Sequence, residues 1–264
     1  MDLQLVGKTA FISGSTSGIG LAIAKVLLVE DAQVILNGRT QDSVEQAIAA
    51  LKTTMPAAKV SGIAADFSDM HSIEQLLTQL YDVDILINNV GVYTAESFFD
   101  ASDDNWQRQW NINVMSGVRL SRHCLPKMLA QNWGRVLFIS SECASLVPED
   151  LIPYSTTKAA LLAVSKGLAQ LTKGTAVTVN TLLPGSTMTA AAQQFLENLA
   201  TQNGTSLAAT EQRFFEDVRT SSLLQRFAGV EEVATTAAYY VSPLAAATNG
   251  AAIRVDGGSM SNLL

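Results

Sequence analysis

The chain has 264 residues, 48% of them hydrophobic, and a formal net charge of −7. Its length allows one large α/β domain or two small ones, and the lack of a Pro-rich or Ser-rich linker or of a repeat favours a single core. The negative net charge argues against a nucleic-acid partner. The chain has only two cysteines, no signal-peptide pattern and no apolar run of roughly 18 residues. These features predict a cytoplasmic protein with no membrane partner.

Short apolar runs alternate with longer segments of helical periodicity along the chain. The runs predicted as strands are KTAFIS, QVILN, KVSGIAAD, VDILINN, GRVLFISS, AVTVNTLLPG and AAIRVDGG. Helices are predicted between them, for example over residues 20–30 and 72–80. Strands this uniformly apolar are usually buried on both faces, as in parallel sheets covered by helices. The pattern predicts a doubly wound, Rossmann-type α/β fold whose ligands bind at the carboxyl ends of the strands.

The first predicted strand leads into SGSTSGIG, with glycines at positions 14, 18 and 20. Glycines let the backbone turn tightly and approach a diphosphate, and the next helix offers free N–H groups and its positive dipole end. The spacing G-x-x-x-G-x-G differs from the common dinucleotide pattern, so a simple turn is the alternative. Its place at the first strand-to-helix junction favours a nucleotide site.

A second motif is Tyr154, four residues before Lys158, in IPYSTTKAALLAVSKG. Residues i and i+4 share one face of a helix, so the phenol and the ammonium can approach the same point. A nearby cation favours phenolate, which predicts a Tyr154 pKa below its ordinary value of roughly 10 and a proton donor and acceptor usable near neutrality. A chance pair on a surface helix is the alternative.

With these two motifs the chain resembles the short-chain dehydrogenase/reductase family nearly from end to end. The further matches are Asp66, Asn88-Asn89-Val90-Gly91, Asn113, Ser141, Pro184-Gly185 and Val255-Asp256-Gly257-Gly258. Ser141 lies 13 residues before Tyr154, the usual interval in this family. The family usually has Ala where this chain has Val90, which is a minor departure.

The resemblance implies an oxidoreductase that transfers a hydride between a nicotinamide coenzyme and a small carbonyl or secondary alcohol. Tyr154 would donate or accept the proton, and Ser141 would hold the carbonyl oxygen. Lys158 would lower the tyrosine pKa and bond the nicotinamide ribose. Asn113 would hold a water that connects Lys158 with solvent.

Three of these assignments have alternatives nearby in the sequence. Ser140 is a weaker candidate than Ser141, because strand alternation should turn it to the opposite face. Asn111 competes with Asn113, and Asn is a poor residue for the middle of a helix in either place. Asp66 is expected at the adenine amino group, but it could instead cap the following helix, as Ser68 or Asp69 also could.

The coenzyme site implied by the resemblance is a set of backbone and side-chain contacts spread over the strand ends. Its members are Gly14, Ser15, Ser17, Gly18, Ile19, Gly20, Arg39, Asp66, Asn89, Gly91, Tyr154, Lys158, Pro184, Gly185, Thr187 and Thr189. No metal ligands are expected, because His71 and His123 lie far from any Cys or carboxylate cluster.

The end of the second predicted strand, Asn37-Gly38-Arg39-Thr40, predicts which coenzyme is used. A site for NAD(H) normally has an acid here for the ribose 2′-hydroxyl, whereas an Arg accommodates a 2′-phosphate. Gly38 stands where the family's acid would be, and Arg39 follows it with a guanidinium that can grip phosphate. Ser15 and Thr40 could add hydroxyl donors. These residues favour NADP(H) over NAD(H), although a solvated Arg39 and the nearby Asp42 leave NAD(H) as the second choice.

Residues 186–227 are predicted to form a helical substrate lid within the single domain. Phe195, Leu199, Phe214 and Phe215 could line its apolar underside, or could simply pack the lid onto the body. Between Ser141 and Tyr154, the acids Glu142, Glu149 and Asp150 suggest that anionic substrates are disfavoured, unless these side chains face solvent.

The resemblance also implies a homo-tetramer, with a dimer second, packed through the helices that contain Asn113 and Tyr154. Two other classes of function remain as alternatives. A non-catalytic dinucleotide-sensing or scaffolding protein would be expected to lack one of the four catalytic residues, and all four are present. A nucleotide-binding methyltransferase would not need Tyr, Lys and Ser at these intervals.

Overall fold

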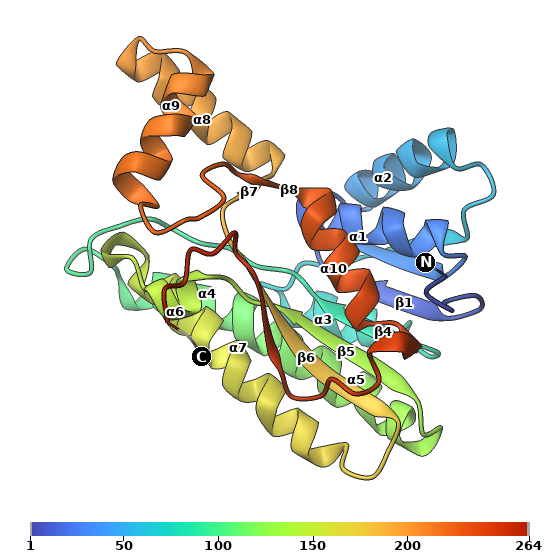
Figure 1. Ribbon diagram of the computed structural model, residues 1–264. Helices are drawn as coiled ribbons and strands as arrows, with labels where there is room; N and C mark the ends of the chain where they lie inside the picture. The colour runs from blue at the N-terminus through green and yellow to red at the C-terminus, as the bar shows by residue number, and fades with distance from the viewer. Residues whose placement is uncertain (1, 263–264) are drawn as a thin grey trace.

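The computed structural model describes residues 2–262 and has a parallel sheet at its centre with helices on both faces (Figure 1). Within these residues the sheet has the strand order β3-β2-β1-β4-β5-β6-β9, and every neighbouring pair is parallel. The strands are β1 (Thr9–Ile12), β2 (Gln33–Gly38), β3 (Val60–Ala64), β4 (Ile85–Asn88), β5 (Gly134–Ile139), β6 (Val177–Pro184) and β9 (Ala252–Val255). Each strand lies in one predicted run, except that β2 extends one residue beyond its run, to Gly38, so the doubly wound fold is confirmed. The strand order reverses between β1 and β4, which is where ligands bind in such sheets.

Helices cover both faces of this sheet. The α-helices of residues 2–262 are α1 (Gly18–Val29), α2 (Gln41–Thr54), α3 (Met70–Leu77), α4 (Asp103–Trp110), α5 (Ser116–Ala130), α6 (Cys143–Leu146), α7 (Ile152–Leu171), α8 (Ala190–Asn203), α9 (Leu207–Arg213) and α10 (Val230–Tyr240). Shorter turns are π-helical at Asn111–Met115 and Phe214–Val218 and 3₁₀-helical at Glu149–Leu151 and Pro243–Ala245. No helix within residues 2–262 is long and apolar enough to cross a bilayer.

Successive strand residues alternate between two hydrophobic cores. In β1, Ala10 and Ile12 belong to the core shared with α1, α2 and α10, whereas Phe11 belongs to the core shared with α3, α5 and α7. The same alternation separates Leu137 from Phe138 in β5. Because side chains of a strand point alternately to its two faces, a strand covered on both sides must be apolar throughout.

The predicted helix around Asn113 is divided into three parts. Helix α4 passes into the π-helical turn Asn111–Met115, and α5 continues from it. Gly117 brings α5 close to the sheet, since a Cβ there would lie 2.8 Å from Cε1 of Phe138. A π-helical turn inside a helix is uncommon and is frequent at functional sites. This turn places Asn113 beside the end of β4.

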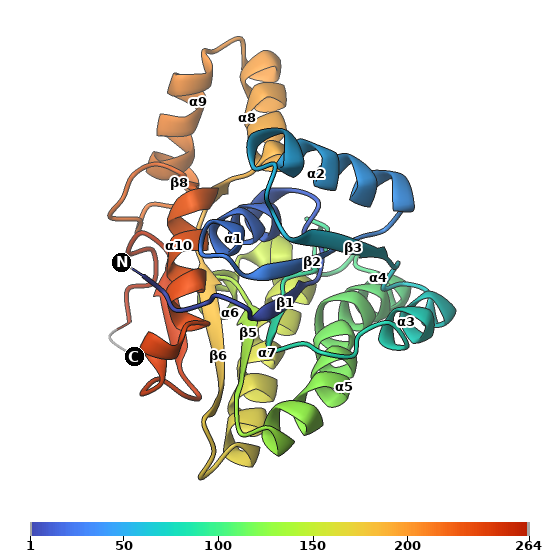
Figure 2. The same cartoon turned by 90° about the vertical axis from the view of Figure 1, so that its right-hand side faces the viewer.

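The 186–227 segment leaves the sheet after β6 and returns to it before α10. Its base is closed by a short parallel pair, β7 (Thr187–Met188) with β8 (Ala228–Gly229). Between these strands, α8 and α9 form a hairpin that stands clear of the sheet (Figures 1 and 2). The segment is helical, as predicted.

This segment has its own small core, formed by Leu196, Phe215 and Phe227 with Phe214 packed against them. Phe195 is 49% exposed and does not belong to this core, so its place on an apolar underside stays a prediction. Neighbouring residues of an α-helix lie about 100° apart around its axis, and here Leu196 takes the buried position instead.

Close packing at Gly117 can be tested with two Gly→Ala substitutions in helices. Gly117→Ala should lower the free energy of unfolding by about 1–3 kcal/mol, because its Cβ overpacks against the buried Phe138. Gly167→Ala in α7 meets no atom within 4 Å and should raise stability by about 0.5–1 kcal/mol through helix propensity. Urea denaturation at equal protein concentration measures both. Equal effects of the two substitutions would show that the α5–β5 approach is not tight.

Candidate active site

The glycine-rich turn lies between β1 and α1. Gly14 and Gly18 adopt φ values of +60° and +57°, in the left-handed region that favours glycine. The Ser17 side chain does not cap α1, and the first turn of α1 contains no acid. The N–H groups and positive dipole end of α1 are thus left available to an anion.

Two asparagines hold this turn in place. The Asn37 side-chain oxygen accepts from the Gly14 N–H at 2.9 Å, which joins the turn to the end of β2. The Asn89 amide donates to the carbonyls of Ser13 and Gly14 at 2.9 and 2.8 Å, which joins it to the end of β4. A Cβ at Gly20 would lie 2.5 Å from that amide nitrogen, so glycine is required for the contact. Asn89 therefore holds the glycine-rich turn through direct hydrogen bonds to its backbone.

A cavity of about 400 Å³ opens beside the turn at the ends of β1, β2 and β4. The predicted coenzyme residues that line it are Gly14, Ser17, Arg39, Asp66, Asn89 and Gly91. Further lining residues that the sequence analysis did not assign to coenzyme are Thr16, Asn37, Gly38, Ala65, Phe67, Ser68, Val90, Val92, Arg108 and Ile112. Most of these adjoin a predicted residue in the chain, whereas Arg108 and Ile112 come from the α4 region and had no local signal.

The wall of this cavity suits a dinucleotide. A Cβ at Gly14 would lie 3.1 Å from Cα of Val90, and one at Gly91 would lie 3.2 Å from Nζ of Lys158, so the wall is backbone where a ligand must approach closely. The cavity also contains the cations of Arg39 and Arg108. Bare backbone, a free helix N-terminus and local positive charge together fit a phosphate-containing ligand.

The end of β2 has no room for an acid. A Cβ at Gly38 would lie 2.6 Å from Cγ2 of Thr16 and 2.7 Å from Oγ of Ser43. Arg39, the next residue, is exposed at the cavity wall. A carboxylate that bonds a ribose 2′-hydroxyl therefore cannot be placed at position 38 without moving its neighbours.

Ser15 does not support the phosphate role suggested for its hydroxyl, and Thr40 is not among the residues that line the cavity. Ser15 is fully buried, where it donates to the Ile12 carbonyl at 2.7 Å and accepts from the Asn37 N–H at 3.0 Å. Thr40 caps α2 by accepting from the Ser43 N–H at 3.2 Å. The hydroxyl residues that line the cavity are Thr16, Ser17 and Ser68.

Asp66 forms a local turn at the cavity edge. Its carboxylate accepts from the backbone N–H and the hydroxyl of Ser68, at 2.8 and 2.7 Å. These bonds, and secondarily the charges of Arg39 and Arg108, hold the pKa of Asp66 below its ordinary value. Asp69 caps α3 instead, so the capping alternative for Asp66 was wrong. Asp66 remains an ionised group facing the cavity.

The four predicted catalytic residues come from three elements and meet at the ends of β4 and β5. Ser141 follows β5, Tyr154 and Lys158 lie on α7, and Asn113 lies on the π-helical turn. The buried Lys158 ammonium donates to the Ile139 carbonyl at 2.9 Å and lies 5.5 Å from the centroid of the Tyr154 ring.

Asn113 is held by three hydrogen bonds. Its oxygen accepts from the Val92 N–H at 2.8 Å, and its amide donates to the Val92 carbonyl at 2.8 Å and to the Thr157 hydroxyl at 2.9 Å. Thr157 in turn donates to the Tyr154 carbonyl at 2.7 Å. Asn111 instead accepts from Gln107 on the preceding turn. Asn113 thus joins the π-helical turn, the loop after β4 and the start of α7.

The two adjacent serines have different partners. Ser140 is buried and donates to the Lys158 carbonyl at 2.8 Å, so it packs the strand end against α7. The Ser141 oxygen accepts from the Cys143 N–H at 3.1 Å, which leaves its own proton available.

The predicted lowering of the Tyr154 pKa was wrong for the protein without coenzyme. Burial of the phenol raises the pKa of Tyr154 above its ordinary value, and interaction with the Ser141 hydroxyl opposes the rise. Burial also lowers the pKa of Lys158 to about 8. The Lys158 ammonium is directed to the Ile139 carbonyl, and loss of water outweighs its attraction for a phenolate.

The remaining predicted residues lie around the base of the 186–227 segment. Thr189 caps α8, and its Cγ2 would lie 3.5 Å from a Cβ at Gly18, so the segment begins beside the glycine turn. Thr187 donates to the Gly185 carbonyl at 2.9 Å, and Gly185 follows Pro184 at the end of β6. Ile19 is partly buried against the first core.

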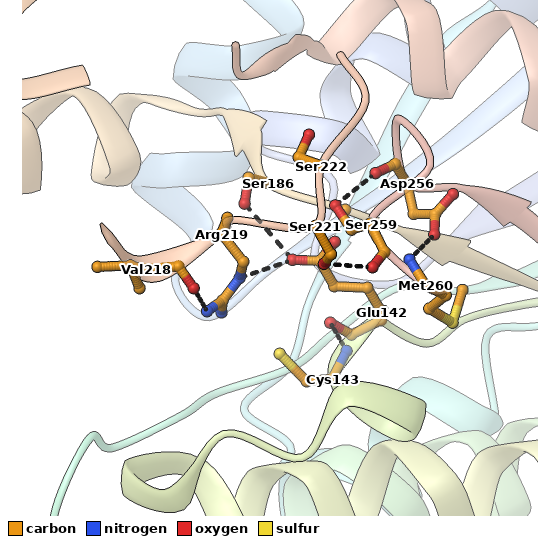
Figure 3. Close-up of polar contacts among 12 residues, drawn as sticks. Glu142, Cys143, Ser186, Val218, Arg219, Ser221, Ser222, Asp256, Ser259 and Met260 are labelled. Carbon is orange, nitrogen blue, oxygen red and sulfur yellow. Dashed lines mark hydrogen bonds and ion pairs between the residues drawn. The ribbon is translucent and has the colours of Figure 1, made fainter. Parts of the chain in front are cut away.

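The acidic residues between Ser141 and Tyr154 do not form a repulsive cluster. Glu149 and Asp150 are exposed to solvent. Glu142 is buried and forms an ion pair with Arg219 (Figure 3). The expected exclusion of anionic substrates therefore loses its physical basis. Residues 2–262 contain no group of three or more His, Cys, Asp or Glu side chains that could hold a metal ion.

Comparisons with known proteins agree with this geometry. Residues 8–200 match the family model described as short chain dehydrogenase. The chain is 43% identical to the uncharacterized oxidoreductase YvaG of Bacillus subtilis (strain 168) over 98% of both proteins, and 44% identical to the uncharacterized oxidoreductase YvrD of the same organism over 100% of both.

Among solved structures, the L-sorbose reductase of Gluconobacter frateurii, complexed with NADPH and L-sorbose, superposes with a TM-score of 0.93 at 32% identity. The superposition covers 100% of each chain. The likeness therefore includes the 186–227 segment as well as the sheet. The chain belongs to the short-chain dehydrogenase/reductase family and is an oxidoreductase that depends on a nicotinamide coenzyme.

Proposed function

We propose that the protein is an NADP(H)-dependent reductase of ketones, or dehydrogenase of the corresponding secondary alcohols, that works through Tyr154, Lys158, Ser141 and Asn113. The convergence of the first three at the end of β5, with Nζ of Lys158 close to Gly91 of the cavity wall, is the observation that carries the proposal. The bound coenzyme would supply or accept the hydride. The protein's task is to hold the carbonyl and to move one proton.

Tyr154 is the proton donor for reduction. Burial raises the pKa of its phenol, so the group is protonated near neutrality and can pass its proton to a carbonyl oxygen as negative charge develops there. Ser141 holds the same oxygen by donating the proton that its bond with the Cys143 N–H leaves free. In the reverse direction Tyr154 must first lose its proton, which favours oxidation at higher pH.

Lys158 and Asn113 support this transfer. The Lys158 ammonium lies within reach of the ribose side of the cavity at Gly91 and stabilises the phenolate that forms when Tyr154 loses its proton. Asn113 orients α7 through Thr157, and the water that it would hold connects Lys158 with solvent. The proton given up by Tyr154 is replaced along this route.

The choice of NADP(H) is supported by the end of β2 and by a solved relative. Gly38 leaves no space for an acid, and Arg39 stands at the cavity wall with a guanidinium suited to a 2′-phosphate. The similar L-sorbose reductase was solved with NADPH.

The 186–227 segment is the lid in this proposal, because it begins beside the glycine turn and returns beside the end of β5. We also propose a cytoplasmic setting and a homo-tetramer packed through the helices that carry Asn113 and Tyr154. The experiment that tests the function is a panel of neutral and charged ketones and alcohols, with NADPH and NADH absorbance as the measurement. Polyhydroxy ketones come first on the panel because of the likeness to L-sorbose reductase.

Replacing Tyr154 tests the proton donor. Tyr154→Phe keeps the ring but removes the hydroxyl, so turnover should fall by about 10²–10⁴-fold while NADPH binding and folding are retained. Tyr93→Phe is the matched control, since its ring lies 5.7 Å from that of Tyr154. Its turnover should stay within a few-fold of the wild type. Substantial turnover by Tyr154→Phe would rule out the mechanism.

Replacing Arg39 tests whether its guanidinium binds the 2′-phosphate of NADPH. Arg39→Ala should raise the KM for NADPH by roughly 10–100-fold and leave the KM for NADH nearly unchanged, because a charge-assisted bond contributes about 1.5–3 kcal/mol. Arg122→Ala, at an exposed position on α5, is the control for loss of one positive charge. A wild type that prefers NADH, or equal losses with both coenzymes, would contradict the assignment.

A further inference from the structure

Two distant parts of the lid segment meet at one buried carboxylate, that of Glu142 (Figure 3). Arg219, directly after the π-helical turn Phe214–Val218, donates from Nε to Oε1 of Glu142 at 3.0 Å. Ser186, at the start of the segment, donates to the same oxygen at 3.4 Å. The Arg219 and Glu142 side chains are only 14% and 3% exposed, so this ion pair is shielded from solvent.

The backbone of Glu142 is held independently of its side chain. Its N–H donates to the Pro184 carbonyl at 2.8 Å, which ties it to the end of β6. Its carbonyl accepts from the N–H groups of Ser145 and Leu146. Glu142 is also flanked by Ser141 and Cys143, which are themselves hydrogen-bonded to each other. The carboxylate is therefore a fixed point attached to the residue that would hold the substrate carbonyl.

Arg219 marks the place where the lid returns to the sheet. Beyond it, the N–H groups of Leu223 and Leu224 donate to the Gly257 carbonyl at 2.9 Å, and Ser221 donates to the Ser259 carbonyl at 2.6 Å. These bonds anchor residues 221–224 to the segment of the chain that follows β9. The ion pair therefore lies between this anchor and the helical part of the lid.

We infer that Arg219 and Glu142 are positioning residues that set the lid against Ser141 and thereby determine how tightly substrate is held. The role rests on the proposed function, and neither side chain touches the reacting atoms. A buried charge requires a partner, so loss of the guanidinium would leave the carboxylate unpaired and release the lid from it. Burial raises the pKa of Glu142, and the charge of Arg219 opposes the rise.

Steady-state kinetics of four lid variants test the inference. Arg219→Gln should raise the KM for the carbonyl substrate about tenfold, an effect within the range of interaction energies between residues in contact. The kcat and the Kd for NADPH should change less than about threefold. Arg219→Lys keeps a cation for the single bond to Oε1 and should recover most of the loss. The double variant Glu142→Gln/Arg219→Gln should bind substrate better than Arg219→Gln alone, because it removes the unpaired charge. Arg213→Gln, an exposed lid arginine on α9, should behave as the wild type.

Hydrogen exchange separates this inference from the proposed function, because it needs no turnover. In the protein without substrate, amides of residues 190–218 should exchange faster in Arg219→Gln than in the wild type or Arg213→Gln, while those of β5 and α7 stay unchanged. Faster exchange would support the positioning role of Arg219 and Glu142 even if no carbonyl were reduced. Unchanged exchange and KM in Arg219→Gln, or equal effects from Arg213→Gln, would overturn it. If Arg219→Gln does not fold, the same comparison is made with Arg219→Lys and Glu142→Gln.

Discussion

The hydrogen bond from the buried Lys158 ammonium to the Ile139 carbonyl is the contact on which the site depends. Removing an ammonium from water disfavours its charge, which is why the pKa of Lys158 falls to about 8. The same burial raises the pKa of Tyr154. The phenol of Tyr154 is therefore protonated, and the ammonium of Lys158 gives up its proton more readily than usual. This arrangement is suited to giving a proton to a carbonyl. Any change that admits water to this pocket alters both groups together.

Parallel strands provide the geometry that this pair requires. Because β1, β2, β4 and β5 end at one edge, the glycine turn, Arg39, Asn89 and Ser141 are brought together from distant parts of the chain. Side-chain amides then fix the backbone course, with Asn37 and Asn89 on the glycine turn and Asn113 on the loop after β4. Each amide bonds main-chain groups that a loop would otherwise leave without a partner.

The lid differs from the body in how it is supported. It has a core of its own, and its base is closed by the β7–β8 pair. It is joined to the body by the carboxylate of Glu142 and by the hydrogen bonds of residues 221–224 to Gly257 and Ser259. The support of this segment is thus separate from that of the sheet and α7, on which Ser141, Tyr154 and Lys158 are held.

The sequence by itself determined the doubly wound sheet, the glycine turn, and the order of Asn113, Ser141, Tyr154 and Lys158. These depend on short-range periodicity and spacing, which the chain carries locally and which the family resemblance made specific. Tertiary structure alone decided that Ser15 faces inward, that Leu196 rather than Phe195 is buried, and that Tyr154 has a raised pKa. It also paired Glu142 with Arg219, 77 residues away. Burial and charge pairing depend on neighbours that are distant in the sequence, so no local pattern could reveal them.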